Sequence, residues 1–199
     1  MELSPRAREK LAQAGELSNT EKEEMKRSEE LTVMLADFFT QKLDNEALWT
    51  KLKEYRDAGS ESVLGEIQLR LLHTLSLGSS GFDFERYMSA ILTTETLKVP
   101  NTNAELEAGL KAIKELRNKY IKEKAEAFEV MKKQIGAQGR MAAQQMSRQS
   151  RKQNLPVDIE GSVEASVRGS AQWRDFNMKY ENSYGQQFSA MITRLAGLL

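Results

Sequence analysis

The sequence predicts an all-α protein in which an N-terminal small helical bundle is followed by a long antiparallel two-helix hairpin. Three observations support this fold class. Apolar residues recur at three- and four-residue spacing, proline occupies only 3 of 199 positions, and no alternating strand pattern of useful length occurs. We expect residues 1–100 to form the short-helix bundle and residues 101–199 to form the hairpin, although the two can also pack as one domain.

The N-terminal half divides into short amphipathic helices. The first is expected over residues 5–14, because Ser4 and Pro5 are favoured at a helix start. Four more are expected: from about Thr20 to Leu43, from Asp44 to Gly59, from Ser60 to Gly78, and after the loop 78–81. Each has an apolar stripe that needs neighbours to cover it, which predicts a bundle. The charged turns 21–30 either project into solvent or rest on a partner.

The C-terminal half begins with a long helix. No proline occurs between residues 101 and 155, and apolar residues there follow a 3.6-residue period: Leu106, Leu110, Ile113, Ile121, Phe128, Met131, Ile135, Ala142 and Met146. A strict 3.5-residue repeat would place Arg117 or Lys124 in the seam. The pattern therefore favours a nearly straight packed helix over an ideal coiled coil.

After a break at Pro156, a second long helix is expected over about 161–198. Gly169 and Gly185 lie inside it, so the sequence leaves its continuity open. Its apolar face carries the candidate interface residues: Trp173, Phe176, Tyr180, Tyr184, Phe188 and Met191. A hairpin buries one stripe per helix and these rings spread wider. We therefore expect the hairpin to dock on the bundle, on a second copy, or on both.

The formal net charge of zero hides a split between the two halves. Residues 1–100 carry 13 basic and 18 acidic side chains, and residues 101–199 carry 16 and 11. Much of the surplus lies in 130–157, which has no acidic residue and holds a basic patch: Lys132, Lys133, Arg140, Arg148, Arg151 and Lys152. Such a patch can meet phosphate backbones, but it contains no aromatic residues for base stacking. Cations favoured near a helix C-terminus explain it more simply.

Enzymatic and metal chemistry receive no support from the sequence. There is no cysteine, and the single histidine, His73, lies on a polar helix face. The spacings of phosphate-binding loops and of nucleophile elbows are missing, as are the ligand sets of zinc and di-iron sites. We expect no catalytic residues, no metal and no cofactor.

These observations lead to one main hypothesis and two alternatives. The main hypothesis is a non-enzymatic, cytoplasmic helical protein that acts through protein–protein assembly as a scaffold or adaptor, as a homodimer or other homo-oligomer or with a protein partner. The alternatives are nucleic-acid association through Lys132–Lys152 and a small-molecule-binding helical bundle that uses the aromatic stripe. The sequence shows no signal peptide and no apolar run long enough for a bilayer, so no membrane role is expected.

Overall fold

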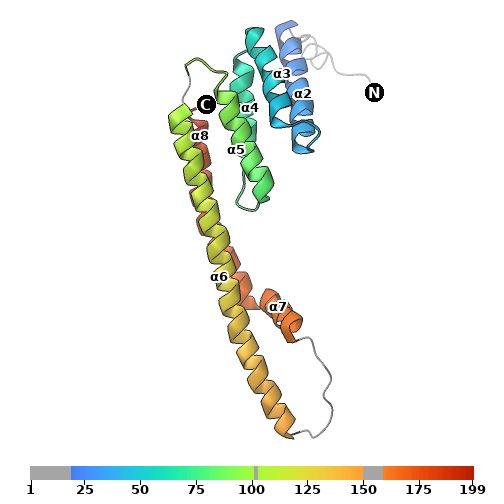
Figure 1. Cartoon of the computed structure of the whole chain (residues 1–199), viewed down its shortest axis with the longest axis vertical. Coiled ribbons are helices and arrows are strands. Elements are labelled where there is room, and N and C mark those ends of the chain that lie inside the picture. Colours follow the sequence, from blue (N-terminus) through green and yellow to red (C-terminus); the bar gives the residue numbers. More distant parts are fainter. Residues whose placement is uncertain (1–18, 101–102, 150–158) are drawn as a thin grey trace, which may run out of the picture. The chain divides into compact units, whose positions relative to one another are not determined.

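The computed structural model describes residues 19–100, 103–149 and 159–199, and every regular element in these ranges is an α-helix (Figure 1). The prediction of an all-α protein is therefore confirmed. The helix expected over 5–14 lies outside the described residues. The chain divides into two compact units, Met1–Ile67 and Gln68–Leu199. The predicted division into residues 1–100 and 101–199 differs from these two units, and it stays a prediction.

From residue 19 on, where its description begins, the first unit holds α2 (Asn19–Phe39), α3 (Asn45–Asp57) and the first turns of α4 (Ser62–Thr74). Their apolar stripes form the core of this unit: Leu31, Met34, Leu35, Phe38, Leu48, Leu52, Val63, Leu64 and Ile67. The helix α2 ends four residues before the predicted Leu43, because Gln41 adopts a left-handed backbone with φ of 62°. The carboxylate of Asp44 then caps α3 by accepting a 2.8 Å hydrogen bond from the Ala47 N–H.

The second unit holds the end of α4 and four further helices: α5 (Gly81–Glu95), α6 (Asn103–Gln149), α7 (Ile159–Gly169) and α8 (Ala171–Ala196). The single helix expected over about 161–198 is therefore two helices. The chain leaves the helical path at Ser170, whose Oγ accepts a 3.1 Å hydrogen bond from the Trp173 N–H and caps α8. Gly185, in contrast, does not interrupt α8.

The helix α6 has 47 residues and is about 70 Å long at 1.5 Å per residue. The residues buried on α6 differ from the predicted stripe around residue 120 and at residue 117. Ile121 is 43% exposed and Tyr120 lies on the buried face instead, because the Tyr120 ring packs against Tyr180 of α8. Arg117 is also buried. Its guanidinium covers the ring of Phe84 and donates a hydrogen bond to a backbone carbonyl, which satisfies part of the buried charge.

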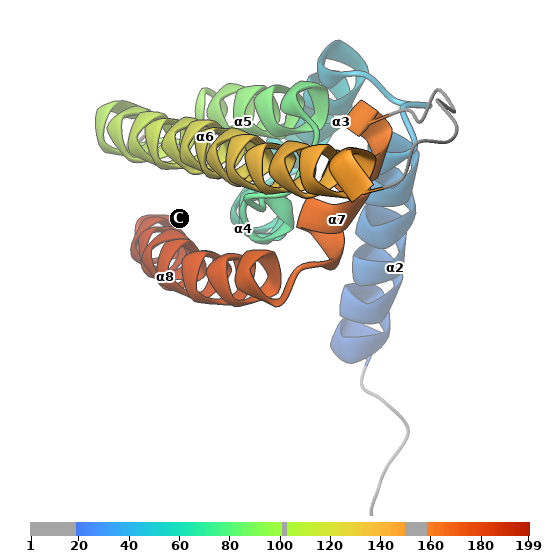
Figure 2. The ribbon, with the colours of Figure 1, turned by 90° about the horizontal axis from the view of Figure 1, so that it is seen from below.

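Helix α8 packs antiparallel against α6, as their contacts in reverse chain order show (Figures 1 and 2). Three pairs mark this order: Gly109 with Leu195, Tyr120 with Tyr184, and Phe128 with Trp173. Helix α7 packs against both α6 and α8. The description of the whole chain as a bundle followed by a hairpin stays a prediction.

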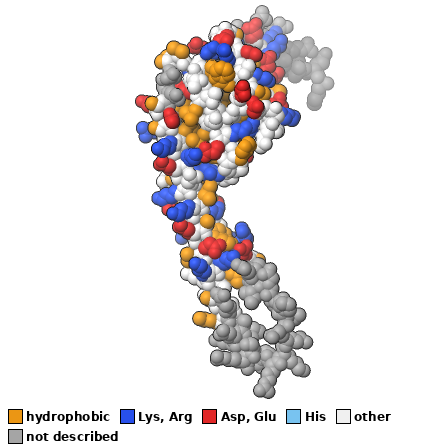
Figure 3. All heavy atoms as spheres, viewed as in Figure 1, with side chains coloured by type: hydrophobic (Ala, Val, Ile, Leu, Met, Phe, Trp, Pro, Cys, Tyr) orange, Lys and Arg blue, Asp and Glu red, His pale blue; other side chains and the backbone are white. Residues whose placement is uncertain are grey.

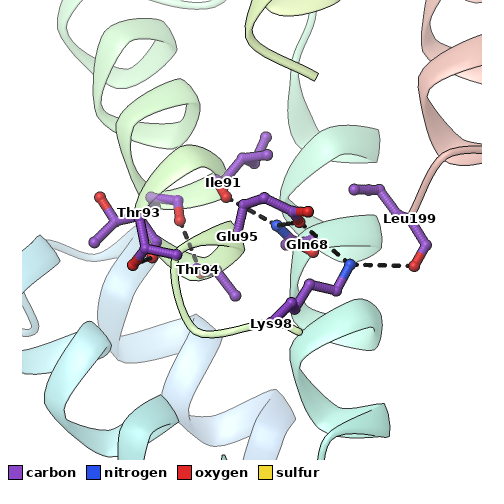
Figure 4. Close-up of polar contacts among 9 residues, drawn as sticks. Gln68, Ile91, Thr93, Thr94, Glu95, Lys98 and Leu199 are labelled. Carbon is purple, nitrogen blue, oxygen red and sulfur yellow. Dashed lines mark hydrogen bonds and ion pairs between the residues drawn. The ribbon is translucent and has the colours of Figure 1, made fainter. Parts of the chain in front are cut away.

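A buried polar cluster joins α4, α5 and the residues beyond α8 (Figure 4). The Gln68 amide donates to the Ile91 carbonyl at 2.9 Å and to the Glu95 carboxylate at 2.8 Å. The Lys98 ammonium lies 3.3 Å from that carboxylate and donates to the Leu199 carbonyl at 3.2 Å. The Glu95 side chain is 1% exposed, and these partners compensate the cost of burying its charge.

None of the helices in the described ranges has both the length and the apolar character that a membrane span requires.

Candidate functional site

The candidate interface residues of α8 lie against α6, and most of them join one cluster of rings. We call this cluster the aromatic seam and define it by two residues of α6 and four of α8: Tyr120, Phe128, Trp173, Phe176, Tyr180 and Tyr184. Within α8, consecutive ring centroids lie 5.4 Å apart for Trp173 and Phe176, 5.0 Å for Phe176 and Tyr180, and 4.6 Å for Tyr180 and Tyr184. The spacing of three or four residues along the helix brings each ring over the next. Trp173, Phe176 and Tyr180 therefore stack in succession, and Tyr184 packs against Tyr180 in a tilted arrangement.

The α6 side chains complete the aromatic seam. The Phe128 ring meets the Trp173 ring edge-on, with 5.1 Å between the centroids. The Arg168 guanidinium of α7 lies over the same Phe128 ring, 5.0 Å from its centroid. Tyr120 lies 5.6 Å from Tyr180 in a stacked arrangement. Aromatic pairs at these distances stabilise a helix contact beyond the area that they bury.

The seam covers most of the predicted interface within a single chain. Trp173 is 8% exposed, and Tyr184 and Phe188 are each 7% exposed. Phe176, Tyr180 and Met191 are half-buried. The aromatic stripe therefore has intramolecular neighbours and does not by itself require a second copy. Its role as an interface between chains stays a prediction.

One carboxylate, Glu123 of α6, organises the hydroxyl groups of the seam. It accepts hydrogen bonds from the Tyr180 hydroxyl at 2.6 Å and from the Tyr184 hydroxyl at 2.7 Å. These two donors lower the pKa of Glu123 because they stabilise its charged form. Burial and the same hydrogen bond to Glu123 raise the pKa of Tyr180. The sequence did not reveal Glu123, but tyrosines on an apolar face indicate that a polar partner lies opposite.

A second polar group beside the seam is Lys124. Its ammonium donates to the Tyr120 hydroxyl at 2.9 Å and to the Glu181 carboxylate at 2.8 Å. Burial alone would lower the pKa of Lys124, but these two hydrogen bonds outweigh it and raise the pKa. Lys124 thus ties α6 to α8 through its ion pair with Glu181, while its hydrogen bond to Tyr120 stays within α6.

The basic patch is only partly within the described residues. Lys132 forms a 2.8 Å ion pair with Glu164 of α7, which lowers the pKa of Glu164. Lys133 is exposed. Arg140 and Arg148 belong to α6, but their side chains lie outside the described part of the structure. Arg151 and Lys152 lie wholly outside the described residues. Residues 130–157 contain no acidic side chain, but α7 places the Glu164 carboxylate against Lys132. Charges of both signs alternate along the visible face of α6 (Figure 3).

An open groove of about 680 Å³ lies between α2 and α3. Its charged walls are formed by six side chains: Lys26, Glu29, Glu30, Asp37, Lys51 and Glu54. Four other residues supply apolar surface: Val33, Met34, Tyr55 and Ala58. Val33 is 62% exposed. The charged turns 21–30 thus form part of a groove wall. The sequence left two alternatives for these turns, exposure to solvent or contact with a partner.

Tyr55 spans this groove from α3 to α2. Its hydroxyl donates to the Glu30 carboxylate at 3.2 Å. Burial and this carboxylate together raise the pKa of Tyr55. This hydrogen bond connects α3 to α2, and Tyr55 lines the groove together with Val33 and Met34.

A smaller cleft of about 420 Å³ lies between the start of α6 and the end of α8. Met191 of the predicted interface lines it together with Ala108, Gly109 and Leu195. Gly109 allows this close approach, because a β-carbon at that position would lie 2.2 Å from Leu195 Cδ2. Gly109 therefore marks a point of close approach between the two helices.

Among the described side chains, no group of three histidine or carboxylate residues is placed to hold a metal ion. His73 is exposed on α4, as its position on a polar face predicts.

Comparison with curated proteins and with solved structures gives no significant match. The family described as "Family of unknown function (DUF6657)" matches residues 49–196. This region includes α6, α7, α8 and the aromatic seam, whereas α2, one wall of the groove, precedes it. Because the match spans 148 of the 199 residues, the chain belongs to the DUF6657 family of unknown function.

Proposed function

We propose that the chain is a non-enzymatic, cytoplasmic helical protein that acts through protein–protein assembly as an adaptor. In this proposal, the short N-terminal helices form a bundle that binds a protein partner in the groove between α2 and α3. The antiparallel α6–α8 hairpin serves as the scaffold. The observation that carries the proposal is the 62% exposure of Val33 inside a groove of about 680 Å³.

The composition of the groove supports a protein partner. Apolar surface from Val33 and Tyr55 lies between charged walls, and protein interfaces commonly combine an apolar centre with a polar rim. A groove between two packed helices also offers the shape that receives a further helix.

The aromatic seam supports the scaffold part of the proposal. Packed rings and the hydrogen bonds of Glu123 hold α8 to α6 along several turns. A rigid pair of helices presents attached segments at fixed positions, which is what a scaffold requires.

The same observations favour assembly over the two alternatives. Nucleic-acid association relies on the basic patch, and the ion pair with Glu164 already engages Lys132. A small-molecule site relies on the aromatic stripe, whose consecutive rings pack against one another with centroids 4.6 to 5.4 Å apart. Both alternatives therefore lose part of the surface that suggested them.

A photo-crosslinking amino acid at Val33 tests the proposal in the cells of origin. Met25 is the control position, since it is also an exposed apolar residue of α2, at 52%, and does not line the groove. We expect a defined adduct from position 33 and not from position 25. An adduct of twice the chain mass identifies a second copy, and another mass identifies a different protein. The absence of any adduct specific to position 33 would overturn the proposal.

Self-association is examined separately by sedimentation equilibrium of the purified chain of 22.6 kDa. A homodimer that uses the groove should return to monomer on Val33→Lys and should persist on Met25→Lys. A monomer at all concentrations up to tens of micromolar leaves a different protein as the partner and excludes the homo-oligomer.

A further inference from the structure

We infer that the groove between α2 and α3 takes a cationic amphipathic helix, with apolar residues on one face and lysine or arginine on both flanks. This partner chemistry rests on the proposed function, because it identifies what the same groove binds. Three features of the groove lead to it: the sign of its charge, the position of its apolar surface, and its length.

The lining of the groove has an excess of carboxylates, which lies on the α2 wall, while the α3 wall holds one carboxylate and one ammonium group. Glu29, Glu30 and Asp37 come from α2 and Glu54 comes from α3, against two ammonium groups, Lys26 and Lys51. A helix that carries cations on both flanks meets carboxylates on each side, which favours its association and its orientation. The same carboxylates repel phosphate groups, so a nucleic acid does not fit this groove.

The groove carboxylates remain available to a partner. Asp37 contacts Lys42 at 3.7 Å, but both side chains are exposed, at 41% and 73%, and such surface pairs contribute little free energy. Glu30 accepts the Tyr55 hydroxyl, which leaves further acceptor positions on its carboxylate.

The apolar surface runs along the groove between these charges. Val33 and Met34 face it from α2, and Tyr55 and Ala58 face it from α3. A visiting helix with apolar residues at positions i, i+3, i+4 and i+7 covers such a strip with one face. Covering Val33 removes an exposed apolar side chain from water, which is the favourable term that charge alone does not supply.

The length of the groove suits a short helical segment. Its lining extends from Lys26 to Asp37 on α2 and from Lys51 to Ala58 on α3. At 1.5 Å per residue these walls are about 16 Å and about 10 Å long, or two to three helical turns. The partner segment therefore needs about 8 to 12 ordered residues in the groove.

A synthetic 18-residue peptide of leucine and lysine, with leucine at helical spacing, is the probe. Its binding to the full chain is measured by fluorescence anisotropy at low salt and at physiological salt. We expect saturable binding that weakens as salt screens the charges. A peptide with glutamate in place of every lysine is expected not to bind.

Two pairs of matched variants separate groove binding from general attraction to acidic surface. Val33→Lys is expected to weaken binding by about tenfold or more, and Met25→Lys by less than about twofold. The triple variant Glu29→Gln, Asp37→Asn and Glu54→Gln is expected to weaken binding similarly. Its control neutralises three exposed carboxylates of α6 with the same change in net charge: Glu107→Gln, Glu115→Gln and Glu129→Gln. Equal effects of test and control variants would overturn the inference.

Failure of this inference is distinguishable from failure of the proposed function. If the lysine peptide does not bind, or binds without regard to Val33, while the crosslinker at Val33 still captures a protein, the groove is a binding site with a different partner chemistry. If position 33 captures nothing specific in cells, the proposed function itself falls. Circular dichroism of each variant checks that the helices remain intact.

Discussion

The α6–α8 contact and the α2–α3 groove are both made by two helices, yet one is closed and the other is open. In the aromatic seam, large rings from both helices fill the space between the backbones, and Trp173 is only 8% exposed. The lining of the groove has a single ring, Tyr55, together with short side chains such as Val33 and Ala58, and Val33 stays 62% exposed. The difference teaches that side-chain volume, as well as apolar spacing, decides whether a helix pair leaves a binding surface.

The largest expected effect is at the centre of the seam. Trp173→Ala removes a ring that contacts both Phe128 and Phe176, and we expect a loss of about 3–5 kcal/mol in the free energy of unfolding, measured with urea. Phe82 is a matched aromatic of the same unit that is 65% exposed. Phe82→Ala is expected to change stability by less than about 0.5 kcal/mol. Similar losses for the two variants would contradict a closed seam.

A smaller effect is expected where α6 and α8 approach closely. Gly109→Ala places a β-carbon 2.2 Å from Leu195 Cδ2, and overpacking of this kind costs about 1–3 kcal/mol, against a helix-propensity gain of about 1 kcal/mol for alanine. We expect a net loss of stability. The control is Gly139→Ala in the same helix, where the β-carbon meets open space. Gly139→Ala should raise the thermal midpoint, whereas Gly109→Ala should lower it. Midpoints of the two variants that shift in the same direction would refute this packing argument.

The pH dependence of the seam is expected to depend on Glu123. Its folded-state pKa is lowered from 4.5 by the Tyr180 and Tyr184 hydroxyls, so its contribution to stability is present above the unfolded value and is lost as the pH falls below about 4.5. Glu123→Gln should therefore be less stable than the parent at neutral pH, and the difference should shrink on the acid side. Urea midpoints at several pH values check this. A difference that is constant with pH would show that the charged form is not what the tyrosines stabilise.

The smallest effect on stability is expected in the groove. Val33→Lys replaces a side chain that is 62% exposed, so the free energy of unfolding should change by less than about 0.5 kcal/mol. Binding of the cationic peptide should nevertheless be lost. A large destabilisation by this variant would mean that Val33 belongs to the core, and the contrast between an open and a closed helix pair would disappear.

The sequence predicted the helical class and the aromatic residues of α8 because periodicity reports which face of a helix is apolar. It did not predict what covers that face, since periodicity carries no information on the neighbour. The choice of Tyr120 over Ile121, one position apart on α6, was decided by rings contributed from α8.

Two further outcomes show where local signals help and where they fail. The break between α7 and α8 had a visible signal in Gly169, and Ser170 supplied the cap. The burial of Arg117 had only the signal of a 3.5-residue repeat, which would place it in the seam. A charged residue is expected on the solvated side unless partners such as the Phe84 ring and a carbonyl receive it. The open groove likewise required both α2 and α3 to be in place.

The chain contains two tryptophans, and each lies in a different compact unit. Trp49 belongs to α3, where the Lys53 ammonium lies 5.5 Å from its ring, and Trp173 belongs to α8, stacked on Phe176. Trp49→Phe and Trp173→Phe therefore each leave one indole as a separate optical reporter. Fluorescence of Trp49 follows the unit that contains α2 and α3, and fluorescence of Trp173 follows opening of the seam, so one chain reports on both regions without an added label.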